Sequence, residues 1–406
     1  MVLIHILSLI FSAVAFLFIL SVVVLIHEAG HFFMARRFGI KIEEFGFGFP
    51  PRLWSKKRGE TRYSINLIPL GGFVKLFGED EAGGGRIQIK NQKSNLKDDI
   101  GRAFFARPPW QRALVILAGV VMNSLLAFVI FYIILFAANF KTQLPAIVDH
   151  KFYFVEQSLN NIIYVTDVAK NSPAQISGIK PYSKVVALNN AKIKNMEEFI
   201  GDVDQNKGKK ITLSLEDEKG KLYNVDIVPR ISAPKNEGRM GVSLGSQGGI
   251  ELVYKTPLQK LFSGITYPVN LTLYSLDGMK QIIKASVKDK SVKEVGENVS
   301  GPLGIFVVIG SLISQSSSIK ELLLQGLSLI GLISISLAFF NVLPIPALDG
   351  GRLFFVLIEM VTRKKINPGI EAKINAGGFI VLISFLIYIT VFFDFPKMAQ
   401  FVKGLF

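Results

Sequence analysis

Long apolar runs dominate the pattern of hydrophobic and polar positions in this chain. A helix needs about 20 apolar residues to cross about 30 Å of hydrocarbon at 1.5 Å per residue. Four runs are long enough, at roughly 4–34, 113–139, 322–343 and 376–395. The third run breaks at 341–346, where two prolines prevent a regular helix from continuing. We expect this break to line a protein-enclosed cavity, or else to form a simple loop at the bilayer edge.

Three segments outside these runs have different patterns. Residues 41–77 are rich in glycine and proline and alternate in polarity near 63–68, which predicts a membrane-associated β-hairpin. Residues 78–101 are glycine-rich and charged, which predicts a cytoplasmic loop. Residues 145–232 predict an inserted α+β domain, because their polarity is mixed. Its expected strands are 162–168, 183–188, 210–215 and 222–228, and its expected helix is 196–203.

The region after this domain is amphipathic. Residues 250–300 carry helical patterns with many lysines, as in 276–284, and we expect them on the outer membrane surface or in a packed loop. The expected domains are an N-terminal membrane core, the inserted domain, an extracytoplasmic amphipathic linker and a C-terminal membrane core. Their bounds are 1–144, 145–232, 233–321 and 322–406.

Composition agrees with a polytopic α-helical membrane protein of about four transmembrane helices. Of the 406 residues, 50% are hydrophobic, a high share for a soluble protein. Cysteine is absent, which excludes disulfides, thiolate zinc sites and a cysteine nucleophile. The net charge of +15 lies mainly in loops beside apolar runs, which favours contact with anionic lipid headgroups. Because no basic helix or aromatic-basic motif accompanies the charge, we expect no nucleic-acid partner.

Basic residues also predict the orientation in the membrane. No Lys or Arg precedes the first run, whereas Arg36, Arg37 and Lys41 follow it, so its carboxyl end is expected to face the cytoplasm. Alternation over four spans then puts the basic 350–375 loop on the same side and the 140–321 region outside. The predicted location is the inner (cytoplasmic) membrane of a cell.

The candidate chemistry lies at the carboxyl end of the first run, in His27-Glu28-Ala29-Gly30-His31. Residues four apart share one face of a helix, so His27 and His31 can take neighbouring corners of a zinc tetrahedron. Glu28 would then act as a general base toward water at the metal. A charged group within a membrane costs about 2.5 to 3.5 kcal/mol on insertion scales, which favours a metal site over a capping or core role.

A catalytic zinc usually has three protein ligands, so a third ligand is expected. The other two histidines, His5 and His150, are poor candidates because one lies near the outer end of the first span and the other in the inserted domain. Asp349 is the best candidate among the carboxylates, because it follows the broken third run at the same membrane face as His31. Its alternative role is an N-cap for a helix at 350–361.

These motifs, in this order, resemble the site-2 protease family of intramembrane zinc metalloproteases, specifically the bacterial branch of regulators of sigma-E protease. The resemblance covers nearly the whole chain. It rests on the HEAGH segment at 27–31, Gly46-Phe47-Gly48-Phe49, Leu117-Ala118-Gly119 with Asn123, Ser300-Gly301-Pro302, and Asn341-Val342-Leu343-Pro344-Ile345-Pro346-Ala347-Leu348-Asp349-Gly350. It implies that Zn²⁺ is bound by His27, His31 and Asp349, that Glu28 is the catalytic base, and that Asn341 helps to hold substrate.

The resemblance also implies that the inserted domain is PDZ-like. Ser172-Pro173-Ala174 and Ser177-Gly178-Ile179 look like the family pattern, whereas Tyr182-Ser183 stands where Gly-Asp is usual. Val120 stands where a proline usually follows Ala118-Gly119, and the chain has length for one PDZ-like domain where many members have two. Such a domain either recognises a peptide terminus or excludes bulky ectodomains, and the resemblance favours exclusion.

The predicted function is hydrolysis of a peptide bond within or near the transmembrane segment of single-span membrane proteins. The resemblance implies regulated intramembrane proteolysis, with anti-sigma factors or remnant signal peptides as substrates. We expect the strand-like element to bind an extended substrate by β-augmentation along 63–68. The candidate substrate contacts are Asn341, Asn123, Ile65 and Asn66.

Two other classes of function fit parts of the sequence. A catalytically inactive scaffold that binds transmembrane helices would keep the fold, but it would have little reason to keep Glu28 and three ligands. A metal or solute transporter would also place polar groups at broken helices, but it should show paired repeats and sites at the midplane of the bilayer.

Overall fold

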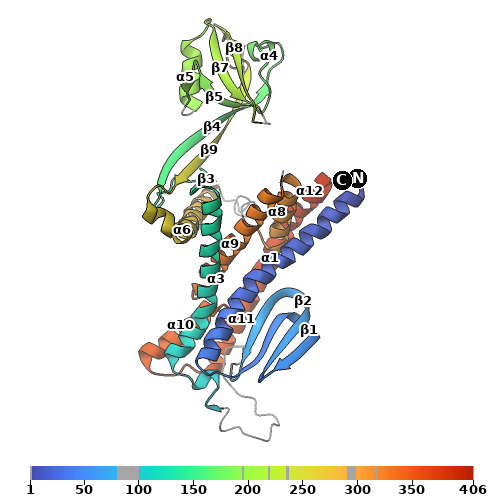
Figure 1. The fold of residues 1–406 in the computed structure, drawn as a ribbon, viewed down its shortest axis with the longest axis vertical. Helices are drawn as coiled ribbons and strands as arrows, with labels where there is room; N and C mark the ends of the chain where they lie inside the picture. The colour runs from blue at the N-terminus through green and yellow to red at the C-terminus, as the bar shows by residue number, and fades with distance from the viewer. Residues whose placement is uncertain are drawn as a thin grey trace. The chain divides into compact units, whose positions relative to one another are not determined.

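The computed structural model describes residues 2–79, 100–193, 196–217, 220–234, 237–289, 299–316 and 318–405 (Figure 1). These residues form two compact units. We call Met1–Ala137 with Phe262–Phe406 the membrane unit, and Ala138–Leu261 the inserted unit. The loop expected at 78–101 lies mostly outside the described residues.

The membrane unit is built around long helices (Figure 1). They are α1 (Val2–Arg37), α3 (Pro109–Ala137), α9 (Ile319–Val342) and α11 (Pro368–Ile389). α11 continues through a π-helical turn, η2 (Thr390–Asp394), into α12 (Phe395–Leu405). Among the described residues, four helices are long and apolar enough to cross a membrane: Leu7–Arg37, Pro109–Ala137, Ile319–Val342 and Gly369–Lys403. The prediction of a helical membrane protein with about four candidate spans is therefore confirmed.

Shorter helices fill the remaining parts of this unit. They are η1 (Phe104–Ala106), α8 (Pro302–Gln315) and α10 (Asp349–Thr362). A further long helix, α6 (Pro257–Asp289), begins in the inserted unit. α8 starts with Pro302 in its first turn, where a missing N–H costs no helical hydrogen bond. The carboxylate of Asp394 accepts a hydrogen bond from the Gly301 N–H at 3.1 Å, which joins the start of α8 to the π-helical turn.

Tight packing of α1 against α3 positions the HEAGH segment at 27–31. Gly30 of α1 lies against the backbone of Ala118 in α3, where an added Cβ would overlap the carbonyl group. Farther along the helices, apolar side chains from α1, α3, α8 and α9 form one buried cluster. Its fully buried members are Ile19, Val23, Ile130, Ile309 and Ile330.

The hairpin predicted at 41–77 is present as two long strands, β1 (Ile42–Arg58) and β2 (Thr61–Leu76). The strands bend back on themselves, so Gly46 pairs with both Ser64 and Phe73. Residues 44–47 lie between 62–65 and 72–76, and residues 52–58 pair with the side of the 61–66 segment that faces away from 44–47. The segment 72–76 consequently forms one edge of the folded sheet, and it lies beside α1, where an added Cβ on Gly72 would be 3.3 Å from Glu28 Cγ.

In its described residues, the inserted unit has a seven-stranded sheet and two short helices. The strand order is β3-β9-β4-β5-β7-β8, with β6 beside β5. The strands are β3 (Lys141–Pro145), β4 (Glu156–Val168), β5 (Lys184–Leu188), β6 (Ala191–Lys192), β7 (Ile211–Glu216), β8 (Leu222–Ile227) and β9 (Val242–Val253), and the helices are α4 (Pro173–Ile176) and α5 (Met196–Gln205). β3 and β9 extend the sheet beyond 145–232, and the glycines of β9 explain its weak strand signal.

Candidate active site

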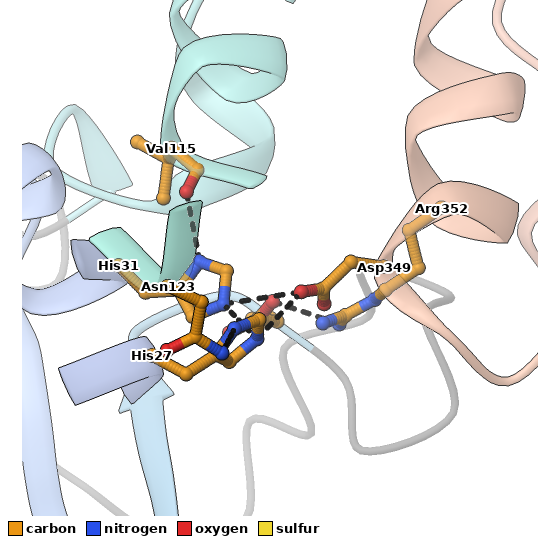
Figure 2. A network of polar contacts seen from close by, with 7 residues as sticks. His27, His31, Val115, Asn123, Asp349 and Arg352 are labelled. Carbon is orange, nitrogen blue, oxygen red and sulfur yellow. Dashed lines mark hydrogen bonds and ion pairs between the residues drawn. The ribbon is translucent and has the colours of Figure 1, made fainter. Parts of the chain in front are cut away.

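Side chains from distant parts of the membrane unit converge at the carboxyl end of α1 (Figure 2). His27 Nε2 lies 2.9 Å, and His31 Nε2 3.2 Å, from the same oxygen of Asp349, Oδ2. The two Nε2 atoms are 3.2 Å apart. Ligands of one tetrahedral zinc ion are separated by about 3.3 to 3.6 Å, given bonds of about 2.0 to 2.2 Å, so the observed separations are slightly shorter than the metal would set. The donor set and its spacing therefore fit a single zinc ion.

The break after α9 brings Asp349 to the histidines. α9 ends at Val342, and the chain passes through residues 343–348 before α10 begins at Asp349. Ala347 has a positive φ of 73°, and its N–H donates to the side-chain oxygen of Asn375 in α11 at 3.2 Å. The N-cap of α10 is Leu348, so the alternative role of Asp349 as an N-cap is not supported.

Helix α3 lies directly behind both histidines. His31 Nδ1 is 2.8 Å from the carbonyl oxygen of Val115, and His27 Nδ1 is 3.3 Å from the side-chain nitrogen of Asn123 (Figure 2). Between these two positions lies Gly119, where an added Cβ would be 2.5 Å from His31 Nε2 and 2.7 Å from His27 Cε1. Only glycine therefore lets α3 approach the two rings this closely.

A cavity of about 190 Å³ adjoins the candidate ligands. It is lined by Glu28, His31 and Asp349 and also by Phe73 and Val74 from the edge of the hairpin. Glu28 thus shares a small polar space with the candidate ligands, as a general base requires.

A second, more apolar cavity of about 490 Å³ lies beside the first. Both are lined by Phe73, Val74, Glu79 and Arg352, and Phe49 and Pro50 add apolar surface to the larger one. Arg352 and Glu79 form an ion pair at 2.7 Å. The only sign of this pair in the sequence is the position of Arg352, about one helical turn after Asp349.

The other candidate residues differ in burial and in their hydrogen-bond partners. Asn341 is buried near the carboxyl end of α9. Asn66 is 4% exposed, and its side chain donates to the Gly48 carbonyl oxygen at 2.9 Å, whereas Ile65 is 45% exposed. Asn123 is 0% exposed behind His27. Asn66 and Asn123 therefore have internal partners, which argues against the expected substrate contacts.

The predicted site of strand addition also needs correction. Residues 62–65 pair with 44–47 on one side and with the 54–57 segment on the other, so their backbone groups face neighbours on both sides. The alternating polarity of 63–68 identifies a strand but does not reveal its neighbours. The sheet edge beside Glu28 is 72–76.

Comparison with known proteins agrees with this geometry. The profile of Peptidase family M50 matches residues 15–385. The chain is similar to zinc metalloprotease RasP of Geobacillus kaustophilus, with 26% identity in an alignment 443 residues long. That alignment covers 93% of this chain and 96% of that protein. It is also similar to metalloprotease MmpA of Caulobacter vibrioides, with 28% identity over 421 residues and 97% and 98% coverage. A protein of Clostridium acetobutylicum is 30% identical over 381 residues, with 94% and 96% coverage. The chain therefore belongs to peptidase family M50 and is a membrane zinc metalloprotease.

Proposed function

We propose that this protein hydrolyses peptide bonds within or near the transmembrane segments of single-span membrane proteins. The observation that carries the proposal is the convergence of His27, His31 and Asp349 beside Glu28 at the end of a membrane-length helix. These three side chains would hold the zinc ion. When bound, zinc supplies Lewis-acid chemistry that polarises a carbonyl group and acidifies water.

Glu28 would carry the proton transfers of the reaction. Its carboxylate lines the 190 Å³ cavity and lies next to the candidate ligand His27 in sequence. It would accept a proton from the attacking water and deliver it to the leaving amine. The apolar side chains of Phe73 and Val74, which line the same cavity, would limit the access of further water.

Substrate would bind as an extended segment along the 72–76 edge. A transmembrane helix keeps its carbonyl groups in internal hydrogen bonds, so it must unwind locally before hydrolysis. An exposed sheet edge can pair with the unwound backbone. Phe73 and Val74 line both cavities, which supports a path in which the substrate lies along them and places an apolar side chain in the 490 Å³ cavity.

Proline substitutions at the two sheet edges would test this path. Phe73→Pro and Val74→Pro each remove one backbone N–H, and at least one of the two is expected to lower kcat/KM for a single-span substrate by about 2- to 12-fold, because a hydrogen bond contributes about 0.5 to 1.5 kcal/mol. Ser55→Pro and Lys56→Pro, on the opposite edge, are the matched controls. Equal losses at both edges would argue against strand addition at 72–76.

The inserted unit would act outside the cytoplasm as a size filter. The basic residues beside α1 and α10 support a cytoplasmic site in an inner membrane, and alternation of the spans then puts the inserted unit on the other side. A PDZ-like filter would admit substrates whose ectodomains have been removed, such as trimmed anti-sigma factors or remnant signal peptides. Peptide recognition is the second candidate role, because a cavity of about 630 Å³ lies between α5 and β9.

Zinc content measured together with cleavage would test the metal site. Protein purified in detergent is expected to hold one zinc ion and to cleave a single-span test substrate. Chelation should abolish cleavage, and added zinc should restore it. Asp349→Ala removes one of the three candidate ligands and is expected to lose both zinc and activity. An Asp349→Ala protein that kept zinc and activity would show that the metal site lies elsewhere.

A further inference from the structure

The two ring nitrogens of His27 have different neighbours. Nε2 faces Asp349 Oδ2 at 2.9 Å, and Nδ1 faces the side-chain nitrogen of Asn123, Nδ2, at 3.3 Å (Figure 2). Asn123 comes from α3 and lies 96 residues away in the chain. The inference drawn from this contact rests on the proposed metal site.

A zinc ion at Nε2 determines what the other nitrogen must do. A neutral imidazole that gives the Nε2 lone pair to a metal carries its proton on Nδ1, which then requires a hydrogen-bond acceptor. The Asn123 Nδ2 group is a donor and cannot fill that role. A metal-bound His27 would therefore place two donors face to face.

The oxygen atom of the Asn123 amide, in turn, needs a hydrogen-bond donor. This atom, Oδ1, is buried and has no hydrogen-bond partner within the described part of the chain. A buried acceptor without a partner costs about 1 to 3 kcal/mol. Turning the amide by 180° about its last torsion exchanges the isosteric oxygen and nitrogen, so Oδ1 takes the position 3.3 Å from His27 Nδ1.

We infer that Asn123 is a positioning residue for the metal ligand His27, accepting the hydrogen bond from its Nδ1–H group. One rotation pairs the imidazole donor with the amide oxygen, and it moves the amide NH2 group to the position that Oδ1 leaves. The side chain is fully buried, so its role is exerted through the histidine and not on substrate. The backbone is held as well, because the Ser334 hydroxyl of α9 donates to the Asn123 carbonyl oxygen at 3.0 Å.

His31 has the corresponding support from the backbone. Its Nδ1 lies 2.8 Å from the Val115 carbonyl oxygen, an acceptor that no side-chain substitution removes. Helix α3 thus supplies an acceptor to each histidine. Only the acceptor for His27 depends on a side chain, so substitution of Asn123 should weaken metal binding selectively through this ligand.

Two nearly isosteric variants separate positioning from packing. Asn123→Leu keeps the branched shape and the number of side-chain heavy atoms but removes the acceptor, whereas Asn123→Asp keeps an acceptor oxygen. The zinc dissociation constant, measured by competition with a chromophoric chelator in detergent, is expected to rise by about 10- to 100-fold in the Leu variant. The Asp variant should bind zinc more tightly than the Leu variant. Ser124→Ala is the control on the same helix, because that hydroxyl donates only to its own helix at Val120.

Equal zinc affinities of the Leu and Asp variants would overturn the inference, as would a Leu variant that binds like the wild-type protein. His27→Ala, measured in parallel, distinguishes a failure of the role of Asn123 from a failure of the proposed metal site. If His27→Ala loses zinc and Asn123→Leu does not, the metal site stands and the role of Asn123 fails. If His27→Ala retains zinc, the proposed site itself fails.

Discussion

Replacing Glu28 with glutamine is expected to lower kcat for cleavage of a single-span substrate by about 10²- to 10⁴-fold while zinc remains bound. The amide has nearly the same size as the carboxylate but cannot accept a proton from water. General-base catalysis contributes about 10²- to 10⁴-fold to a reaction rate, so kcat should fall by that factor. The zinc content should not change, because the three candidate ligands are His27, His31 and Asp349.

Glu43→Gln is a suitable control for this measurement. Glu43 lies in the hairpin and pairs with Lys75 at 3.4 Å in a half-exposed ion pair, which contributes little to stability. This variant should therefore cleave like the wild-type protein. If Glu28→Gln retained full activity with zinc bound, another group would have to be the base.

Replacing Gly119 with alanine is expected to impair zinc binding, although the residue is no ligand. The added methyl group would lie 2.5 Å from His31 Nε2 and 2.7 Å from His27 Cε1, so the imidazoles or α3 must shift. Overpacking costs about 1 to 3 kcal/mol. If the imidazole rings are displaced and zinc binding is weakened by this free energy, zinc affinity falls by about 5- to 150-fold. The measurement is the zinc dissociation constant, with cleavage as a second readout.

Gly326→Ala gives the matched comparison within a membrane helix. Gly326 lies in α9, and an added Cβ there would meet nothing within 4 Å. This variant should keep both zinc and activity. Unchanged zinc affinity in Gly119→Ala would mean that α3 can move away from the rings without cost, which the close contact of Gly30 with Ala118 opposes.

The sequence was sufficient to predict the parts of the site that depend on local spacing. His27 and His31 share a helix face because they are four residues apart. The prolines at 344 and 346 predicted the end of α9, which stops at Val342. Asp349 was predicted from its place after this break, and it lies within hydrogen-bond distance of His27.

The remaining features depend on contacts between distant segments. Polarity identified a strand near 63–68, but only the register shows that 62–65 is an inner segment and 72–76 an edge. Asn123 was assigned to substrate because its motif gives no direction for its side chain. Its direction follows from the packing of α3 against α1, which one sequence does not specify.

The placement of the three candidate ligands has a consequence for biosynthesis. His27 and Asp349 are 322 residues apart in the chain, and the groups behind the histidines come from α3. A nascent chain that has inserted α1 and α3 holds only two of the three donors. On this ligand assignment, the zinc site is complete only after Asp349 has been synthesised and has packed against α1, so an unfinished chain holds no complete site for hydrolysis.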